Sequence, residues 1–300
     1  MLVVPCLRCR VQLTMTKHPT VVICGPTSWN QLIELDRLPE PRPQQQVARN
    51  SWNTAGGTSA GKALHLASLG VDTSLYTPIG SDGPGKLLRQ ALENTGIKLN
   101  ALSSANTEQH VNLMAGGERV SIYVATPSSP SLEDINSSCA AVRNADAAVV
   151  DLSELGLKVI EFCGNEHPPL WVDLHDYDGL KEFHRPFLRA AHVAFMNSDA
   201  AEDPWELLSI CLRGGPQLAI CTLGEQGAIA MDLQGQRWTV PAQKVEVIDT
   251  NGAGDAFMAG FMAAHLRGMP VQHSLARAAE QAASAISTRH LHPALSSLAG

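Results

Sequence analysis

The feature that most constrains the fold is a regular alternation of short apolar runs and helical stretches in the second half of the chain. The apolar runs are 147–152, 170–174, 192–196 and 218–223, and the helical stretches are 132–143, 154–163, 179–190 and 202–213. Such alternation is typical of right-handed βαβ units, which build a parallel sheet covered by helices on both faces. We therefore expect an α/β fold with a central, mostly parallel sheet.

The remaining segments extend this pattern at both ends. A short apolar run at 20–25 is typical of a buried strand, and the polar, proline-rich sequence to about residue 53 indicates a loop or an excursion from the core. Two alternating runs around the turn 115–118 predict a hairpin. Further helices are expected at 58–69, 83–95, 254–267 and 271–287, and further strands at 71–79, 227–233 and 237–241.

No linker divides the chain, so we expect residues 19–300 to form one domain. Within it, parts of about 28–57 and 108–125 are expected to make a small β-sheet lid. Residues 1–18 carry basic side chains but no continuous apolar stretch, which is unlike a signal peptide. They are predicted to be a disordered or mis-annotated extension.

The composition narrows the classes of partner. A net charge of −7 argues against a nucleic-acid-binding or anionic-membrane surface, and no apolar run is long enough to span a bilayer. The seven cysteines are mostly scattered singly, which is typical of reduced thiols rather than a disulfide framework. Eleven histidines without ligand spacing argue against structural zinc. We expect a cytoplasmic protein without nucleic-acid or membrane partners.

One segment predicts chemistry. Asp249-Thr-Asn-Gly-Ala-Gly-Asp255 leads directly into a strongly apolar helix, so Gly252, Ala253 and Gly254 form the turn that opens it. A helix start offers unpaired N–H groups and partial positive charge to an anion. Asp255, in the first turn, could accept a proton from a hydroxyl beside that anion. A tight turn with Asp255 as a helix cap is the alternative, and the full run favours the catalytic interpretation.

Residues 247–268 resemble the C-terminal signature of the ribokinase (PfkB-type) carbohydrate kinase family, Asp-Thr-x-Gly-Ala-Gly-Asp-x-Phe. Gly56-Gly57, the helix that ends at Leu69-Gly70 and the turn Gly80-x-Asp82-x-x-Gly85 resemble its N-terminal signature. The resemblance covers about 20–290 and implies a ribokinase-like three-layer sandwich with a small β-sheet lid. It also implies an ATP-dependent kinase with Mg²⁺ and in some members K⁺. Asp255 would be the base and Gly252, Ala253 and Gly254 the anion hole.

The resemblance also assigns binding residues. The nucleotide would contact Asn197, Thr222, Gly224, Gly227 and Asn251, and the substrate Asn30, Gly56, Gly57, Thr58, His110 and Asp173. A monovalent cation would bind near Asp249 and Thr250, and Asp199 and Glu202 are candidate Mg²⁺ ligands. A homodimer through the lid is expected from some members, with Val111, Leu113, Ile122 and Val124 as its apolar contacts.

Three positions depart from the family pattern. Asn30 stands where many sugar kinases carry an aspartate, and Gly61 where ribokinase has an asparagine, so ribose is disfavoured as the acceptor. The family's Asn-x-x-Glu is displaced, because Asp199 and Glu202 follow Asn197 at a different offset. Asp173 stands at a strand end, where it either caps the next turn or binds substrate or metal.

The sequence from Gly56 to Ala63 nearly matches the motif of a phosphate-binding P-loop. Ala63 replaces the required Ser or Thr and the preceding residues are polar, so we reject that interpretation. Lys62 is then either near the substrate or, in the favoured interpretation, a solvated helix residue.

The leading hypothesis is an MgATP-dependent kinase of a sugar or sugar-like alcohol. A nucleoside kinase and a non-catalytic sugar- or nucleotide-binding member are the alternatives. A Rossmann-type dehydrogenase is disfavoured because no Gly-x-Gly-x-x-Gly follows the first strand.

Overall fold

The structure, a computed structural model, describes residues 18–298. Its centre is a nine-stranded sheet in the order β13-β12-β11-β10-β9-β8-β1-β4-β5. The first two strands of this order are antiparallel to their neighbours and the others are parallel, as expected from the alternating pattern. The strands are β1 Thr20–Cys24, β4 Asp72–Gly80, β5 Lys98–Ser104, β8 Ala147–Val150, β9 Leu170–Asp173, β10 Val193–Asn197, β11 Leu218–Thr222, β12 Ala228–Asp232 and β13 Arg237–Val240.

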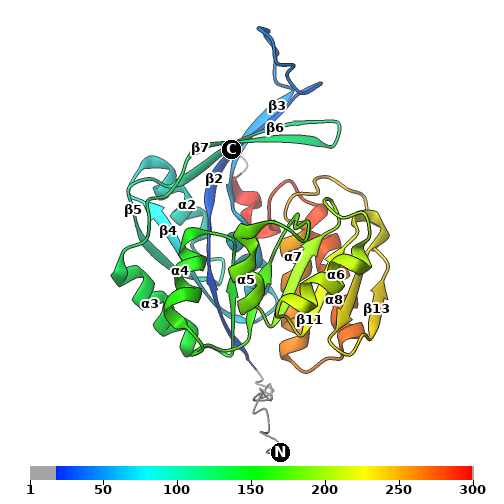
Figure 1. Ribbon diagram of the computed structural model, residues 1–300. Coiled ribbons are helices and arrows are strands. Elements are labelled where there is room, and N and C mark those ends of the chain that lie inside the picture. The colour runs from blue at the N-terminus through cyan, green and yellow to red at the C-terminus, as the bar shows by residue number, and fades with distance from the viewer. Residues whose placement is uncertain (1–17, 299–300) are drawn as a thin grey trace, which may run out of the picture.

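Helices cover both faces of this sheet, in three layers (Figure 1). Successive side chains of β1 point to opposite faces, so Ile23 belongs to the apolar core beneath α1, α7 and α8, and Val22 to the core beneath α3–α6. The helices are α1 Thr58–Ser68, α2 Gly83–Leu92, α3 Leu132–Arg143, α4 Glu154–Cys163, α5 Arg185–Ala190, α6 Pro204–Gly214, α7 Ala253–Leu266 and α8 Val271–Ile286, with 3₁₀ turns at Glu182–His184, Gly224–Gln226 and Pro293–Leu298.

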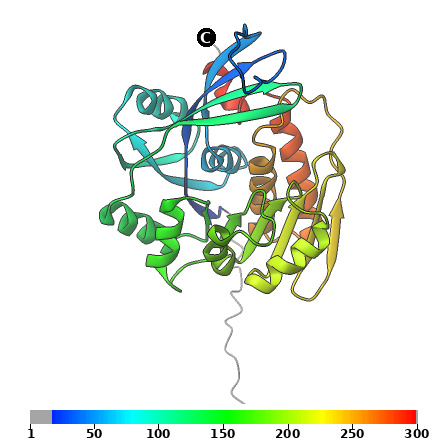
Figure 2. The same ribbon diagram turned by 45° about the horizontal axis from the view of Figure 1, so that its top comes forward.

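A second, smaller sheet has the order β3-β2-β6-β7 and is called the small sheet below. Its strands are β2 Ser28–Glu34, β3 Asn50–Gly56, β6 Glu108–Ala115 and β7 Glu118–Ala125. It crosses over one end of the central sheet (Figures 1 and 2). The chain enters it directly after β1 and β5 and leaves it into α1 and α3, which puts it at the carboxyl edge of the parallel strands. The three-layer fold with a separate small sheet confirms the predicted fold class.

The structure adds detail to three local expectations. The polar segment before residue 53 contains β2 and most of β3 on either side of a proline-rich loop, within the segment 28–57 that was expected to contribute to a small β-sheet lid, and these strands keep polar residues because they are buried on only part of their surface. Edge strand β5 was not predicted, because Lys98–Ser104 is polar and mostly half-exposed. The helix expected at 179–190 is shorter and begins with the 3₁₀ turn at Glu182.

The prediction for residues 1–18 concerns 1–17, which lie outside the described residues, and His18 alone is described. Within residues 18–298, the helices lack the length and apolar character that crossing a bilayer would require.

Candidate active site

The site begins at the N-terminus of α7, whose apolar residues anchor it between α1, α8 and the sheet. Gly252 precedes the helix with φ of +80°, a left-handed conformation that favours glycine. Apart from the neighbouring backbone, no described atom lies within 4 Å of a Cβ built on Gly254. The N–H of Ala253 donates to the Thr250 carbonyl oxygen at 3.3 Å, and the space beside Gly254 is open, as an anion-binding site at a helix N-terminus requires.

Asp255 is at this helix start and is only 9% exposed. The hydroxyl group of Thr58, at the start of α1, donates a hydrogen bond to Asp255 Oδ1. Burial raises the pKa of the Asp255 carboxyl above its ordinary value, Lys62 opposes that rise, and Asp173 adds to it. A carboxyl group with a raised pKa is a stronger proton acceptor once ionised, so its surroundings suit a general base.

Lys62 is fully buried, so its favoured interpretation as a solvated helix residue was wrong. Its Nζ lies 2.7 Å from Asp151 Oδ1, 3.2 Å from Asp255 Oδ1 and 3.3 Å from Asp173 Oδ2. Burial alone would lower the pKa of the Lys62 ammonium, but the three carboxylates raise it above its ordinary value. Three strand and helix ends thus converge on one buried cation.

Asp173 lies at the carboxyl end of β9 and is also buried. Its Oδ1 accepts the backbone N–H of His175 at 3.0 Å, and its Oδ2 is 3.6 Å from His175 Nδ1. Burial opposes ionisation, but His175 and Lys62 outweigh it and lower the pKa of Asp173. The strand-end carboxylate therefore both caps the next turn and faces the same site as Asp255.

The predicted substrate residues of the small sheet lie together. Asn30 pairs in register with His110 and packs so closely on Gly56 that a Cβ there would be 2.0 Å from Asn30 Nδ2. Asn30 Oδ1 is buried, and among residues 18–298 it has no hydrogen-bond partner. Gly57 has φ of +90° and begins α1 against the backbone of Pro26 and Thr27. His110 bonds to Glu108 at 2.9 Å and packs on Tyr123, with ring centroids 4.0 Å apart.

The predicted nucleotide residues follow two neighbouring parallel strands. Asn197 ends β10 and Thr222 ends β11, where the two residues are paired in register. Gly224 and Gly227 both have positive φ in the turn after β11, and a Cβ on Gly227 would be 2.0 Å from the Val240 carbonyl oxygen. Asn251 Oδ1 accepts a hydrogen bond of 2.9 Å from Arg119 of β7, which joins the small sheet to the anion-hole turn.

The candidate metal residues do not form a protein-only site. Within the described part of the chain, no group of three or more His, Cys, Asp or Glu side chains is arranged to hold a metal ion. Asp199 and Glu202 are exposed after β10, and Asp249 Oδ1 accepts the N–H of Asn251 at 2.9 Å. Thr250 is exposed in the same turn. Asp199 and Glu202 stay candidate Mg²⁺ ligands, and in nucleotide sites Mg²⁺ generally takes much of its coordination from phosphates and water.

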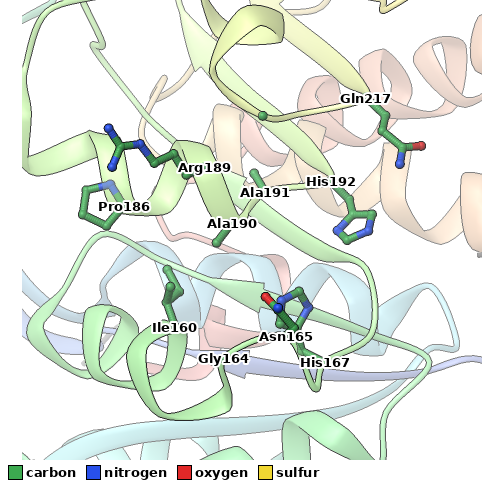
Figure 3. Close-up of a pocket in the computed structure, with 11 residues that line it drawn as sticks. Ile160, Gly164, Asn165, His167, Pro186, Arg189, Ala190, Ala191, His192 and Gln217 are labelled. Atoms are coloured by element: carbon green, nitrogen blue, oxygen red, sulfur yellow. The ribbon is translucent and has the colours of Figure 1, made fainter. Parts of the chain in front are cut away.

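A separate cavity of about 500 Å³ lies at the opposite edge of the central sheet. Figure 3 shows His167, His192 and Gln217 around it, each just before a parallel strand begins. None of the candidate site residues lines it.

Sequence reasoning missed Asp151 and the true position of Lys62. Asp151 is completely buried, and its Oδ2 accepts a 2.6 Å hydrogen bond from Ser59 of α1. The available signal was a carboxylate directly after the apolar strand 147–150, at the sheet edge where Asp173 ends β9. An ionised residue there needs a buried partner, and Lys62 was the remaining unassigned cation near the substrate turn.

Comparisons with known proteins agree with this geometry. The model of the pfkB family of carbohydrate kinases matches residues 20–296. Acarbose 7(IV)-phosphotransferase of an Actinoplanes species is 27% identical over 269 residues, which cover 87% of this chain and 90% of that protein. The nucleoside kinase of Methanothermobacter thermautotrophicus is 27% identical over 274 residues, with 85% of each chain covered.

Solved structures share the fold. A microbiome-derived acarbose kinase superposes with a TM-score of 0.81 at 22% identity and covers 90% of this chain and 93% of its own. Arabidopsis thaliana ribokinase, solved with ribose and ATP, superposes with a TM-score of 0.76 at 22% identity, with 94% and 97% covered.

The fold and the family match define a kinase that transfers a phosphoryl group to an alcohol group. The chain belongs to the pfkB family of carbohydrate kinases, and its reaction is the ATP-dependent phosphorylation of a sugar-like molecule.

Proposed function

We propose that this kinase phosphorylates a hydroxyl group of a neutral, sugar-like acceptor, with Asp255 as the general base. The observation that carries the proposal is the juxtaposition of a buried carboxylate at Asp255 with the open space beside Gly254 at the N-terminus of α7. A proton acceptor and an anion site side by side are the two elements that phosphoryl transfer to a hydroxyl requires.

In this mechanism the acceptor hydroxyl points at Asp255, which takes its proton as the new O–P bond forms. The bond from the γ-phosphorus to the β,γ-bridging oxygen breaks, and ADP leaves. The N–H groups at the start of α7 stabilise the negative charge on the transferring group. Asn197, Thr222, Gly224 and Gly227 would border the nucleotide, and Mg²⁺, when bound with it, would supply further charge neutralisation. The small sheet acts as a lid that excludes water.

The charges of the site favour a neutral acceptor. Asp173 and Asp255 both lie at the acceptor position, and one cation, Lys62, is shared between them and Asp151. An acidic acceptor would add a further negative charge to this buried group. Asn30 offers an amide that both donates to and accepts from hydroxyl groups without carrying charge. The relatives include acarbose kinases and a ribokinase, whose acceptors are sugar-like, and also a ribose-1-phosphate kinase and fructoselysine 6-kinases, whose acceptors carry charge, so the preference for a neutral acceptor rests on the charges of this site.

A nucleoside kinase is the second candidate. The ring pair His110 and Tyr123 on the small sheet could stack on a nucleobase, and a nucleoside kinase is among the relatives.

The test is ADP release in the presence of Mg²⁺ across neutral sugars, pseudo-sugars, sugar acids and nucleosides. We expect neutral polyhydroxylated acceptors to stimulate ADP release and sugar acids not to. A sugar acid as the best acceptor would refute the proposed acceptor class. If no acceptor stimulates ADP release while a sugar still raises the melting temperature, the chain is a non-catalytic binding member.

The Asn30 amide is expected to bind the acceptor, because its buried Oδ1 has no partner among residues 18–298. Replacing Asn30 with alanine should raise KM for the acceptor about 10- to 100-fold, as expected when one or two hydrogen bonds are lost, and should leave KM for ATP nearly unchanged. Asn100→Ala, on the distant edge strand β5, is the matched control and should change neither constant. Equal effects of Asn30→Ala on both KM values would remove Asn30 from the acceptor site.

A homodimer through the small sheet is part of the proposal. Strand β7 is one of the two edge strands of that sheet, and Val120, Ile122, Tyr123 and Val124 on it are 43–63% exposed. An exposed apolar edge strand is a template for pairing with another copy. Light scattering should give twice the chain mass, and Ile122→Asp should weaken dimerisation at least about tenfold because it would bury a charge. A monomeric wild type at high concentration would contradict this.

Two features of the proposed kinase support a cytoplasmic location. They are its need for ATP and the five buried free cysteines of the described residues. A requirement for K⁺ near Asp249 and Thr250 stays a prediction, and comparing rates in K⁺ and tetramethylammonium salts tests it.

A further inference from the structure

Lys62 occupies an unusual place for a lysine. It lies in the middle of α1 with 0% of its surface exposed, and it is surrounded by carboxylates from three other elements. Asp151 comes from the end of β8, Asp173 from the end of β9 and Asp255 from the start of α7. Lysines are almost never fully buried unless they are paired. The Lys62 ammonium group is therefore a buried, structural part of the site.

The contacts of Lys62 divide into an anchor and two partners. The anchor is Asp151, which is fully buried, lies 2.7 Å from Lys62 Nζ and is held from its other side by Ser59. Asp173 and Asp255 are the partners at 3.3 and 3.2 Å, and they retain 7% and 9% exposure, whereas Lys62 and Asp151 retain none. Because Lys62 lies behind these carboxylates and is itself inaccessible, it cannot contact an acceptor directly.

The neighbouring residue supports the same arrangement. A Cβ built on Gly61 would lie 2.8 Å from Asp255 Oδ2 and 3.0 Å from Asp255 Cβ. Any other residue at this position would push the carboxylate away from α1. Glycine within a helix destabilises it, so its presence here is explained by the close approach of Asp255. Gly61 makes room for Asp255 over α1, and Lys62 holds it there.

We propose that Lys62 is a positioning residue that holds Asp255 and Asp173 as a fixed pair of carboxylates beneath the acceptor. The proposal rests on the proposed role of Asp255 as general base. Thr58, which bonds to both Lys62 and Asp255, completes the link between the two side chains. Lys62 thereby keeps the base ionised and aimed, although it touches neither the acceptor nor the phosphoryl group.

The direction in which Lys62 shifts the pKa of Asp255 follows from the charged groups around that carboxyl. Burial and Asp173 raise the pKa of the Asp255 carboxyl, while Lys62 and, to a smaller extent, His175 lower it. Asp151 adds a further negative charge on the far side of Lys62. Removing the cation therefore raises the pKa of the base, and the acid limb of the kcat/KM profile, which reports on the free enzyme, moves to higher pH.

The test compares pH–rate profiles and melting curves of wild type, Lys62→Met and Asp151→Asn. Lys62→Met keeps the length of the side chain without its charge. We expect kcat to fall about 10- to 100-fold through misplacement of the base, and the acid limb to move up by about one pH unit. KM for ATP should change little.

Asp151→Asn is expected to shift the acid limb of the pH–rate profile in the opposite direction. It also keeps the test decisive if Lys62→Met does not fold. Its amide oxygen can still accept from Lys62, but one negative charge is gone, so the acid limb should move below that of wild type. A lowered melting temperature with an unmoved acid limb in either folded variant would overturn the proposal, because Lys62 would then be only a structural ion pair. If Asp255→Asn itself keeps its turnover, the assigned base is wrong instead, so the two failures are distinguishable.

Discussion

Replacing Asp255 with asparagine is expected to lower kcat by about 10²- to 10⁴-fold, the usual contribution of a positioned general base. The amide is nearly isosteric, and its oxygen can still accept hydrogen bonds from Thr58 and Lys62, which hold the native carboxylate. The fold and the ATP site should therefore survive, and KM for ATP should change by less than about threefold. Acceptor-dependent ADP release, with the melting temperature measured in parallel, checks both expectations.

Asp82→Asn is the matched control for this variant. Asp82 caps α2 and accepts three hydrogen bonds, from Gly85 N–H and from the hydroxyl and N–H of Thr107. Burial opposes the ionisation of Asp82, but these hydrogen bonds outweigh it and lower its pKa. Its replacement should lower the melting temperature and leave kcat nearly unchanged, whereas Asp255→Asn should do the reverse. Near-full turnover by Asp255→Asn on a genuine acceptor would remove it as the base.

The sequence predicted the parts of the site that are contiguous in the chain. The turn Gly252–Gly254 and Asp255 are adjacent, and the apolar helix after them is readable from composition alone, so their chemistry could be inferred without a structure. The parallel sheet was predictable for the same reason, since each βαβ unit is a local pattern.

Convergence of distant residues was harder to predict. Lys62 and Asp151 are 89 positions apart, and a buried lysine has the same sequence appearance as a solvated one. Nothing in α1 alone indicates that strand ends at β8 and β9 direct carboxylates at it. The bounds of β2 and β3 within the lid segment 28–57 could not be predicted for a related reason, because the burial of a small-sheet strand depends on what lies beneath the sheet and not on its own composition.

The two halves of the site therefore differ in kind. The half that we propose handles the phosphates depends on the backbone of one turn, Gly252–Gly254, and its geometry is local. The acceptor half is assembled from the small sheet, two strand ends and α1, and small changes in any of them alter which molecule fits. The relatives are named for acceptors as different as acarbose, nucleosides and ribose, as such an acceptor half would allow.

Replacing Gly254 with alanine is the sharpest test of the anion hole. Apart from the neighbouring backbone, no described atom lies within 4 Å of a Cβ at this position, and alanine favours the helix, so the protein should fold normally and gain up to about 1 kcal/mol of stability. The added methyl group would occupy space meant for the phosphoryl group, and misplacement by about 1 Å costs on the order of 100-fold in kcat/KM. Gly83, in the first turn of α2, has an equally open surrounding, and Gly83→Ala should gain similar stability without losing activity. Full activity of Gly254→Ala would mean that the phosphoryl group passes elsewhere, since no folding defect is expected to obscure the result.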